Sequence, residues 1–127
     1  MVGREILGSV LAVSALVPAS RTADASGDII DLQGFEACMI VFHAGVLGGA
    51  TTPTLLEADD TTTTFTAVAA ANMVGGLFVA ATASAVQSRA YKGSKRYLRL
   101  IDDHADASAD LTSAVYLLSN ARHVPVS

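Results

Sequence analysis

Apolar and polar residues alternate over short stretches along most of the chain, and turn-forming residues separate these stretches. The clearest stretch is 37–44, where β-branched and aromatic residues run between Gly34 and Gly45. Such a run predicts a β-strand. Because it is apolar on both faces, we expect this strand to be central in its sheet rather than at an edge.

The same signals predict further strands at residues 7–17, 29–32, 54–58, 65–68, 84–90, 96–101 and 111–118. Pro18 lacks the amide proton that a strand ladder needs, so we expect it to end the first strand. Residues 77–80 are apolar and fit either a strand or an exposed loop. Polar or glycine-rich loops are expected at residues 20–28, 45–53 and 102–110.

About eight short strands, spaced near ten residues apart, are typical of β-sandwiches and jelly rolls. The sequence shows no long helical pattern and no alternation of strands with helices. It therefore predicts an all-β fold, an antiparallel β-sandwich or jelly roll, formed by one domain over residues 1–127. The N- and C-terminal segments are expected to extend onto neighbouring subunits.

Residues 91–101 hold an unusual concentration of charge in a chain dominated by Ala, Thr, Val and Leu. Residues 92–95 predict a turn, because glycine and serine favour one. From Arg96 the strand period places Arg96 on one face and Arg99 on the other, each among apolar side chains. Neither face is then plainly core or plainly solvent. Each guanidinium must snorkel, pair with a carboxylate or meet another chain.

Charge is scarce along the whole chain. Charged residues make up 16% and hydrophobic residues 51%, and the formal net charge is -4. A surface so poor in charge predicts that other subunits cover part of it, as a homo-oligomer. The acidic balance argues against a nucleic-acid partner. Near the N-terminus, Glu5 lies in the charged segment, and Gly8, Ser9 and Ser14 interrupt the apolar run that follows it. Both features argue against a secretory signal, a membrane helix and a membrane partner.

Two acidic clusters are candidate metal sites. Glu57, Asp59 and Asp60 surround one predicted turn, without the spacing or the glycine of an EF-hand loop. The second cluster, in residues 102–110, contains Asp102, Asp103, His104 and Asp106, which a metal-dependent enzyme would use as ligands. In both segments solvated turns are the simpler expectation.

Nothing in the sequence has the pattern of a catalytic centre. No glycine-rich phosphate loop follows a strand, and no GxSxG motif is present. His43, at the end of a predicted strand, has no ligand partner at a suitable spacing. Cys38, the single cysteine, is expected to be a small buried apolar side chain. We therefore expect no enzyme activity, no metal and no cofactor.

Three segments in order, 31–37, 56–68 and 91–99, are similar to small β-rich proteins encoded in the head modules of tailed bacteriophages and prophages. The quoted motifs are DLQGFEA, LEADD followed by FTAV, and YKGSKRYLR. The resemblance implies a virion structural protein, and most directly a capsid cement or decoration protein on the outer surface of the capsid. Its partner would be the major capsid protein. The family has no catalytic motif to transfer.

Contact residues follow as a hypothesis within this resemblance. Basic side chains would pair with capsid carboxylates, and an apolar run and the chain ends would add apolar contact; these residues are Lys95, Arg96, Arg99, Leu77, Phe78, Val79 and, in the C-terminal tail, Arg122. The oligomer would be a trimer or a dimer. The alternatives are a head–tail connector or tail structural protein, and a carbohydrate-binding β-sandwich, which the absence of tryptophan weakens.

Overall fold

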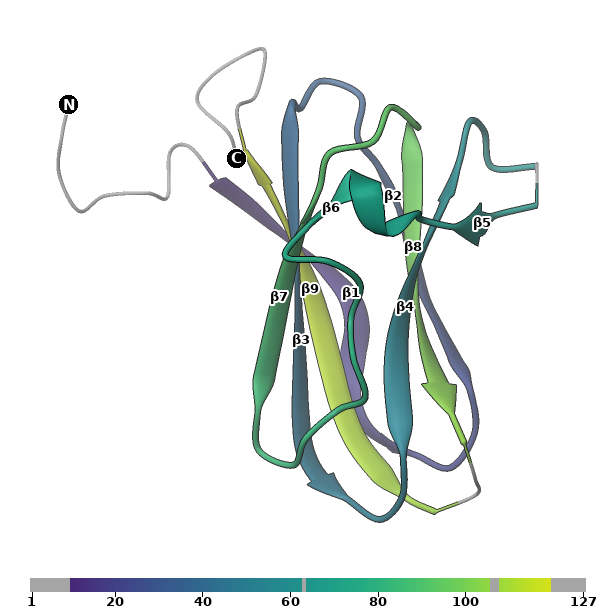
Figure 1. Cartoon of the computed structure of the whole chain (residues 1–127), viewed down its shortest axis with the longest axis vertical. Coiled ribbons are helices and arrows are strands. Elements are labelled where there is room, and N and C mark those ends of the chain that lie inside the picture. Colours follow the sequence, from purple (N-terminus) through teal and green to yellow (C-terminus); the bar gives the residue numbers. More distant parts are fainter. Residues whose placement is uncertain (1–9, 63, 106–107, 120–127) are drawn as a thin grey trace, which may run out of the picture.

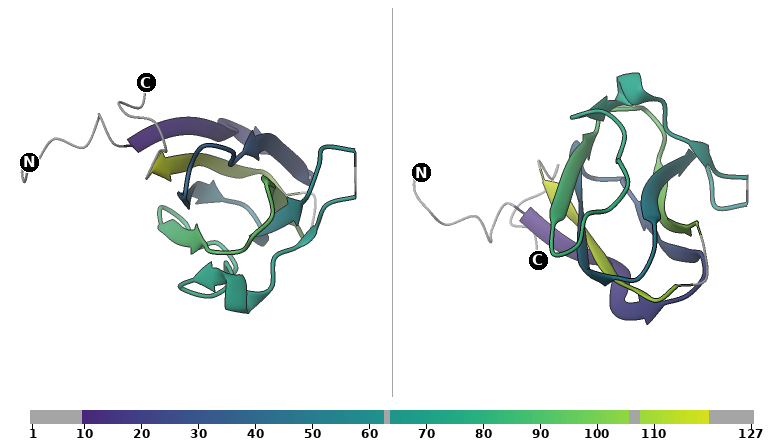
Figure 2. Two further views of the ribbon diagram at one scale, coloured as in Figure 1. Left: turned by 90° about the horizontal axis from the view of Figure 1, so that it is seen from above. Right: turned by 60° about the horizontal axis from the view of Figure 1, so that its bottom comes forward.

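The computed structural model describes residues 10–62, 64–105 and 108–119, which form two antiparallel sheets packed as a sandwich (Figures 1 and 2). The five-stranded sheet has the order β1 (Val10–Arg21), β9 (Asp110–Ser119), β3 (Ala37–Leu47), β7 (Val86–Tyr91), β6 (Met73–Val74). The four-stranded sheet has the order β2 (Ala25–Asp31), β8 (Tyr97–His104), β4 (Thr51–Ala58), β5 (Thr66–Ala67). The predicted all-β sandwich is confirmed.

The two sheets interleave early and late strands. β9 lies between β1 and β3, and β8 lies between β2 and β4, so each sheet is completed by a strand from the C-terminal part of the chain. The one helical element among the described residues is the short 3-10 helix Ala70–Asn72. Within that described part, no helix has the length and apolar character needed to cross a membrane.

Alternate side chains of the long strands form the core between the sheets. Ile40 and Phe42 of β3, Leu98 and Leu100 of β8, and Tyr116 of β9 have no exposed surface. Burial of an apolar side chain of this size stabilises the fold by about 1.5–3 kcal/mol. The strands predicted at 37–44 and 111–118 are confirmed, since they lie within β3 and β9 and alternate side chains of each enter this core.

β3 is central, as predicted, but only one of its faces is buried. Cys38, Ile40 and Phe42 point into the core, whereas Met39 and His43 lie on the exposed outer surface of the sheet. An antiparallel sheet needs only one covered face, and none of the described residues forms a layer over the second face of β3.

β1 continues through Pro18 to Arg21, so the prediction that Pro18 ends this strand is wrong. The ladder with β9 is irregular between Ser14 and Ala19, and β1 is the edge strand of its sheet. A proline is tolerated at such a position because no ladder hydrogen bond requires its missing N–H. The loops predicted at 20–28 and 45–53 are also shorter, since β2 begins at Ala25 and β3 and β4 are separated by 48–50.

β2 contains a bulge opposite β8, and a core tyrosine supports it. The register shifts between Ser26 and Ile29, which leaves the Leu100 amide without a ladder partner in β2. The Tyr116 hydroxyl accepts a hydrogen bond from that amide at 2.9 Å and donates one to the Asp28 carbonyl at 2.8 Å. This hydroxyl therefore connects the two sheets through the core. Burial raises the pKa of Tyr116, so the group remains protonated.

The segment 75–85 crosses the open side of the sandwich between β7 and β4 (Figure 1). Its Ala81 amide donates to the Thr51 carbonyl at 2.8 Å, and its Ser84 amide donates to the Gly45 carbonyl at 3.0 Å. Positive φ angles at Gly75 and Gly76, 96° and 82°, turn the chain out of β6 into this segment. Residues 77–80 thus form a loop and not a strand.

Candidate functional site

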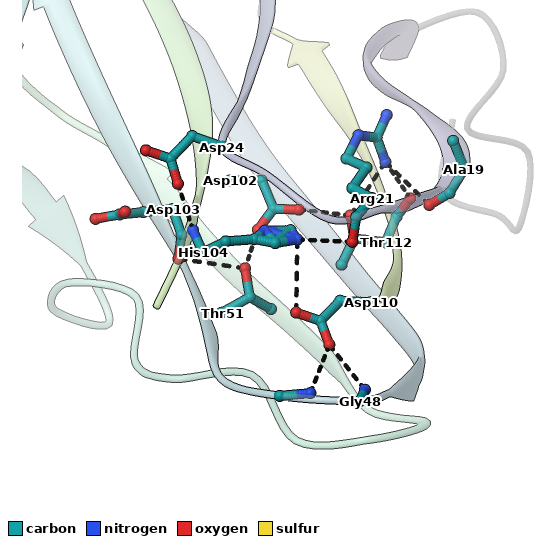
Figure 3. A network of polar contacts seen from close by, with 11 residues as sticks. Ala19, Arg21, Asp24, Gly48, Thr51, Asp102, Asp103, His104, Asp110 and Thr112 are labelled. Atoms are coloured by element: carbon teal, nitrogen blue, oxygen red, sulfur yellow. Dashed lines mark hydrogen bonds and ion pairs between the residues drawn. The ribbon is translucent and has the colours of Figure 1, made fainter. Parts of the chain in front are cut away.

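A buried polar cluster lies at the end of the sandwich where β1 and β8 end and β9 begins (Figure 3). Asp102 of β8 is its centre and has no exposed surface. The hydroxyls of Thr51 and Thr112 each donate to one oxygen of its carboxylate, the latter at 2.6 Å. Arg21 Nη1 donates to the Thr112 carbonyl at 2.8 Å and lies 3.1 Å from its hydroxyl. The cluster thereby links β1, β4, β8 and β9.

Asp110 and His104 form the second half of this cluster. Asp110 Oδ1 accepts hydrogen bonds from the amides of Gly48 and Gly49 at 2.9 and 3.0 Å, which fixes the turn between β3 and β4. Asp110 Oδ2 lies 3.5 Å from His104 Nε2, and both side chains are almost completely buried. Asp110 Oδ2 and His104 Nδ1 have no hydrogen-bond partner among the described residues.

The expectation that residues 102–110 form a solvated loop is wrong for Asp102, His104 and Asp110. β8 extends to His104 and β9 begins at Asp110, so both of these side chains and Asp102 are inside the sandwich. Strand alternation separates Asp102 from Asp103, which is exposed on the other face of β8. Asp106 lies outside the described residues. Closed to solvent and held by threonine hydroxyls and backbone amides, this cluster is placed to stabilise the fold.

The acidic turn of Glu57, Asp59 and Asp60 is also divided among separate contacts. Glu57 accepts a hydrogen bond from the Tyr91 hydroxyl at 2.6 Å, and Asp59 forms a salt bridge with Lys95 at 2.9 Å. Asp60 Oδ1 accepts from the amide and the hydroxyl of Thr62, each at 3.0 Å. In the described ranges, no group of three or more His, Cys, Asp or Glu residues is arranged to hold a metal ion.

Three of the four basic residues predicted to contact a partner have partners within the chain. Lys95 pairs with Asp59, and this hydrogen bond raises the pKa of Lys95. Arg96 donates two hydrogen bonds of 2.8 Å to Asp31, which lower the pKa of that carboxyl. Arg99 Nε donates to the Gly27 carbonyl at 3.0 Å, and its guanidinium lies 5.8 Å from the Phe65 ring centroid.

The strand face with Leu98 and Leu100 is entirely core. The expectation that neither face of residues 96–101 is plainly core is therefore wrong. Arg96 precedes the first residue of β8, so its guanidinium is not forced onto the buried face. Arg99 lies on the outer face of the four-stranded sheet. The sequence suggested carboxylate pairing for such guanidinium groups, and for Arg96 the structure shows it.

The predicted apolar contact residues 77–79 separate into exposed and buried members. Leu77 and Val79 are 51% and 60% exposed, whereas Phe78 is buried. The Arg89 guanidinium lies over the Phe78 ring, 5.5 Å from the ring centroid. The Gln87 side-chain amide accepts from the Val79 N–H and donates to the Val79 carbonyl, at 3.0 and 2.8 Å. Leu77 and Val79 therefore form a fixed exposed ridge. Arg122 lies outside the described residues.

A larger surface that sequence reasoning missed is the outer face of the five-stranded sheet. One row across all five strands, set by the strand register, is Ala12, Leu117, Met39, Ala90 and Val74. The next rows are Ser14, Val115, Val41 and Ser88, then Ser113, His43 and Val86. We call these twelve positions the uncharged face, because none is Asp, Glu, Lys or Arg.

The uncharged face exposes large apolar side chains. Met39 is 40% exposed, Val115 38%, Val74 55% and Val86 58%. At one end it adjoins a hollow of about 650 Å³ between the turns at 32–36 and 92–95. Buried Cys38 lines this hollow, and burial raises the pKa of its thiol to about 12. The signal in the sequence was the lack of charge at alternate positions, such as Ser113, Val115 and Leu117 of β9.

Comparison with known proteins places the fold and no more. No protein-family model matches the chain, and no curated protein matches it. Among solved structures it is similar to the PBSX exported protein XepA, with a TM-score of 0.62 and 19% identity over 92% of this chain. The match spans only 39% of XepA.

Two further structures match along most of their own length. The SPBc2 prophage-derived protein YomS has a TM-score of 0.61 and 8% identity, over 86% of this chain and 91% of YomS. A protein from Bacillus endospore appendages, described as disulfide-linked pili, has a TM-score of 0.54 and 9% identity, over 87% of this chain and 88% of its own. Identities this low establish a common sandwich fold, and a fold alone does not determine function.

Proposed function

We propose that this protein is a structural component of a tailed-bacteriophage or prophage particle. Within that class we propose a cement or decoration protein, bound to the outer capsid surface and bridging subunits of the major capsid protein. The observation that carries the proposal is the distribution of exposed apolar side chains. Among the described residues, six of the ten exposed large apolar side chains lie on the uncharged face or on the Leu77–Val79 ridge, and clustered apolar surface is typical of proteins that assemble.

The strand order supports the proposal. β1-β9-β3-β7 in one sheet and β2-β8-β4-β5 in the other alternate early and late strands, as two Greek keys do in a jelly roll. We take the jelly-roll assignment as part of this proposal. Viral capsid domains and lectins are among the proteins built on that fold. Similarity to a prophage-derived protein, YomS, and the sequence resemblance to phage head-module proteins favour the viral alternative.

The capsid contact that we propose is centred on the ridge of Leu77 and Val79. Both side chains are exposed on a segment that is hydrogen-bonded to β7 and to the ends of β3 and β4, so little ordering is needed on binding. The Lys95 and Arg96 side chains remain about half exposed beside their own carboxylates. Lys95 and Arg96 can bind capsid carboxylates only by giving up Asp59 and Asp31, whereas Leu77 and Val79 contribute through burial of their apolar surface.

A cement protein stabilises a shell by linkage. It binds the assembled capsid and not the separate subunits, so each bound copy shifts the equilibrium toward the assembled state. Symmetric repetition over the shell multiplies modest single contacts. Quantitative mass spectrometry of purified particles tests the proposal directly. One copy per major capsid subunit, or a simple fraction of one, supports it. A few copies per hundred would indicate a connector or tail protein, and absence from particles would refute both.

A matched pair of variants tests the ridge. Val79→Asp introduces a charge into the proposed contact, and we expect capsid occupancy to fall at least tenfold, because an unpaired charge is costly to bury. Val17→Asp is the control, since Val17 is 63% exposed on β1 against 60% for Val79. Occupancy is measured by sedimentation of decorated shells. Equal occupancy for both variants would contradict the proposed contact.

A further inference from the structure

We propose that the uncharged face is a self-association surface, on which a second copy of this chain packs sheet against sheet. The proposal concerns the purified chain and does not rest on the proposed function. The face lies on the outside of the β1-β9-β3-β7 sheet, and among the described residues no other part of the chain covers it. Its members are side chains of strands that are paired residue by residue, so their positions are fixed before any partner binds.

Electrostatics favours a second copy as the occupant. The chain has a formal net charge of -4, so two copies repel each other through most orientations. Across the twelve positions of the uncharged face, the sole titratable side chain is His43, in the last row. Apposition of two such faces brings no carboxylate or fixed cation out of water. A surface of this kind is complementary to itself, as the two-fold interface of a homodimer requires.

The shape of the face fits sheet-on-sheet packing. In the first row, large Leu117 and Met39 lie between small Ala12 and Ala90, which forms a ridge beside shallow grooves. In the next row, Val115 and Val41 are flanked by Ser14 and Ser88 in the same way. Two faces with a central apolar ridge and small flanking residues interdigitate at the separation of about 10 Å that packed sheets adopt.

The area of the face allows a weak, reversible dimer. Its three rows span about six residues of about 3.3 Å on each of four strands spaced about 4.8 Å apart, which gives roughly 400 Å² per copy. Two copies would bury about 800 Å², below the range of standard specific interfaces. The expected association is therefore weak, with a dissociation constant on the order of micromolar.

Analytical ultracentrifugation of the purified full-length chain over a range of concentrations tests this inference. We expect the mass-average mass to rise with concentration from the monomer value of 13.0 kDa toward the dimer. Val115→Glu places a carboxylate at the centre of the face and should weaken association at least about 30-fold. Ile29→Glu is the matched control on the other sheet, because Ile29 is 36% exposed against 38% for Val115; it should associate like the wild type.

Circular dichroism verifies that each variant is folded. If Val115→Glu does not fold, Ser88→Glu, at an exposed serine on β7, repeats the test. A wild-type chain that stays monomeric to about 100 μM would overturn the proposal, since that concentration far exceeds the expected dissociation constant. So would a Val115→Glu chain that associates normally. If Val115→Glu leaves a monomeric chain unchanged but abolishes particle binding, the face belongs to the capsid and the second-copy assignment is wrong.

Discussion

The outer faces of the two sheets differ in the side chains they expose and in the partners those side chains have within the chain. On the four-stranded sheet, charged side chains have partners nearby: Arg99 donates to the Gly27 carbonyl and stacks on Phe65, and at the end of β2 Asp31 pairs with Arg96. On the five-stranded sheet, the uncharged face carries only apolar, serine and histidine side chains, four of them valines or methionine at 38–58% exposure.

The charged groups of the four-stranded face are already paired in the solvated monomer, whereas the apolar side chains of the uncharged face would lower the free energy if a partner buried them. Charged groups that already bond within the chain lose those contacts if a partner displaces them, whereas exposed valines lose nothing when they are buried. The comparison therefore makes opposite predictions for the two faces. Substitution on the four-stranded side should change the stability of the monomer, and substitution on the uncharged face should change association.

The largest expected effect on stability is at the hydroxyl that holds the four-stranded sheet from inside. Tyr116→Phe leaves the Leu100 amide and the Asp28 carbonyl at the β2 bulge without their partner in the core. Loss of a buried partner costs about 1–3 kcal/mol of unfolding free energy. Urea denaturation measures the change. Tyr97→Phe is the control, because it keeps the ring beneath Arg96 and should shift stability by no more than about 0.5 kcal/mol.

An intermediate effect is expected where the same bulge is held from outside. Arg99→Ala removes the hydrogen bond to Gly27 and the contact with Phe65, which should lower the free energy of unfolding by about 0.5–1 kcal/mol. Met39→Ala, on the uncharged face, should destabilise the monomer less but weaken self-association more. If both variants changed stability equally and association equally, the contrast between the faces would be refuted.

Local pattern was enough to predict elements whose own residues determine their conformation. The strand at 37–44 follows from its β-branched and aromatic residues, and the turn at 92–95 from its Gly-Ser pair. The strand end at Pro18 and the exposure of the acidic residues in 102–110 were predicted incorrectly, because both depend on strands that are distant in the sequence. Pairing with β9 continues on the far side of Pro18, so β1 extends to Arg21. Asp102 and Asp110 are buried between the sheets, where they accept hydrogen bonds and are not solvated.

The candidate surfaces show the same limit. Exposure of Leu77 and Val79 could be expected from an apolar run after two glycines, but the position of Phe78 under Arg89 depends on how 75–85 crosses the sandwich. The partners of Lys95 and Arg96 lie 36 and 65 residues away in the chain. The uncharged face could not be assembled from sequence, because the order β9-β3-β7 places strands side by side that the chain separates.

The smallest expected effect is a pH dependence on the four-stranded side. Hydrogen bonds from Arg96 lower the pKa of Asp31 below its ordinary value of 3.8, so the folded state favours the ionised carboxyl. This contribution to stability is present above about pH 3.8 and is lost as the pH falls through the lowered pKa of the folded chain. The effect should be small, because the side chains of both Asp31 and Arg96 are more than a third exposed to solvent.

Thermal melts of wild type and Asp31→Asn between pH 2 and pH 6 measure this contribution, since the variant should lose less stability on acidification. Val115→Glu supplies the converse on the uncharged face, where the new carboxylate has no Lys or Arg among the twelve positions and should gain a smaller dependence than the Asp31–Arg96 pair. An Asp31→Asn chain with the acid profile of the wild type would show that the ion pair stabilises nothing. Charge pairing would then stabilise the four-stranded side no more than it stabilises the uncharged face.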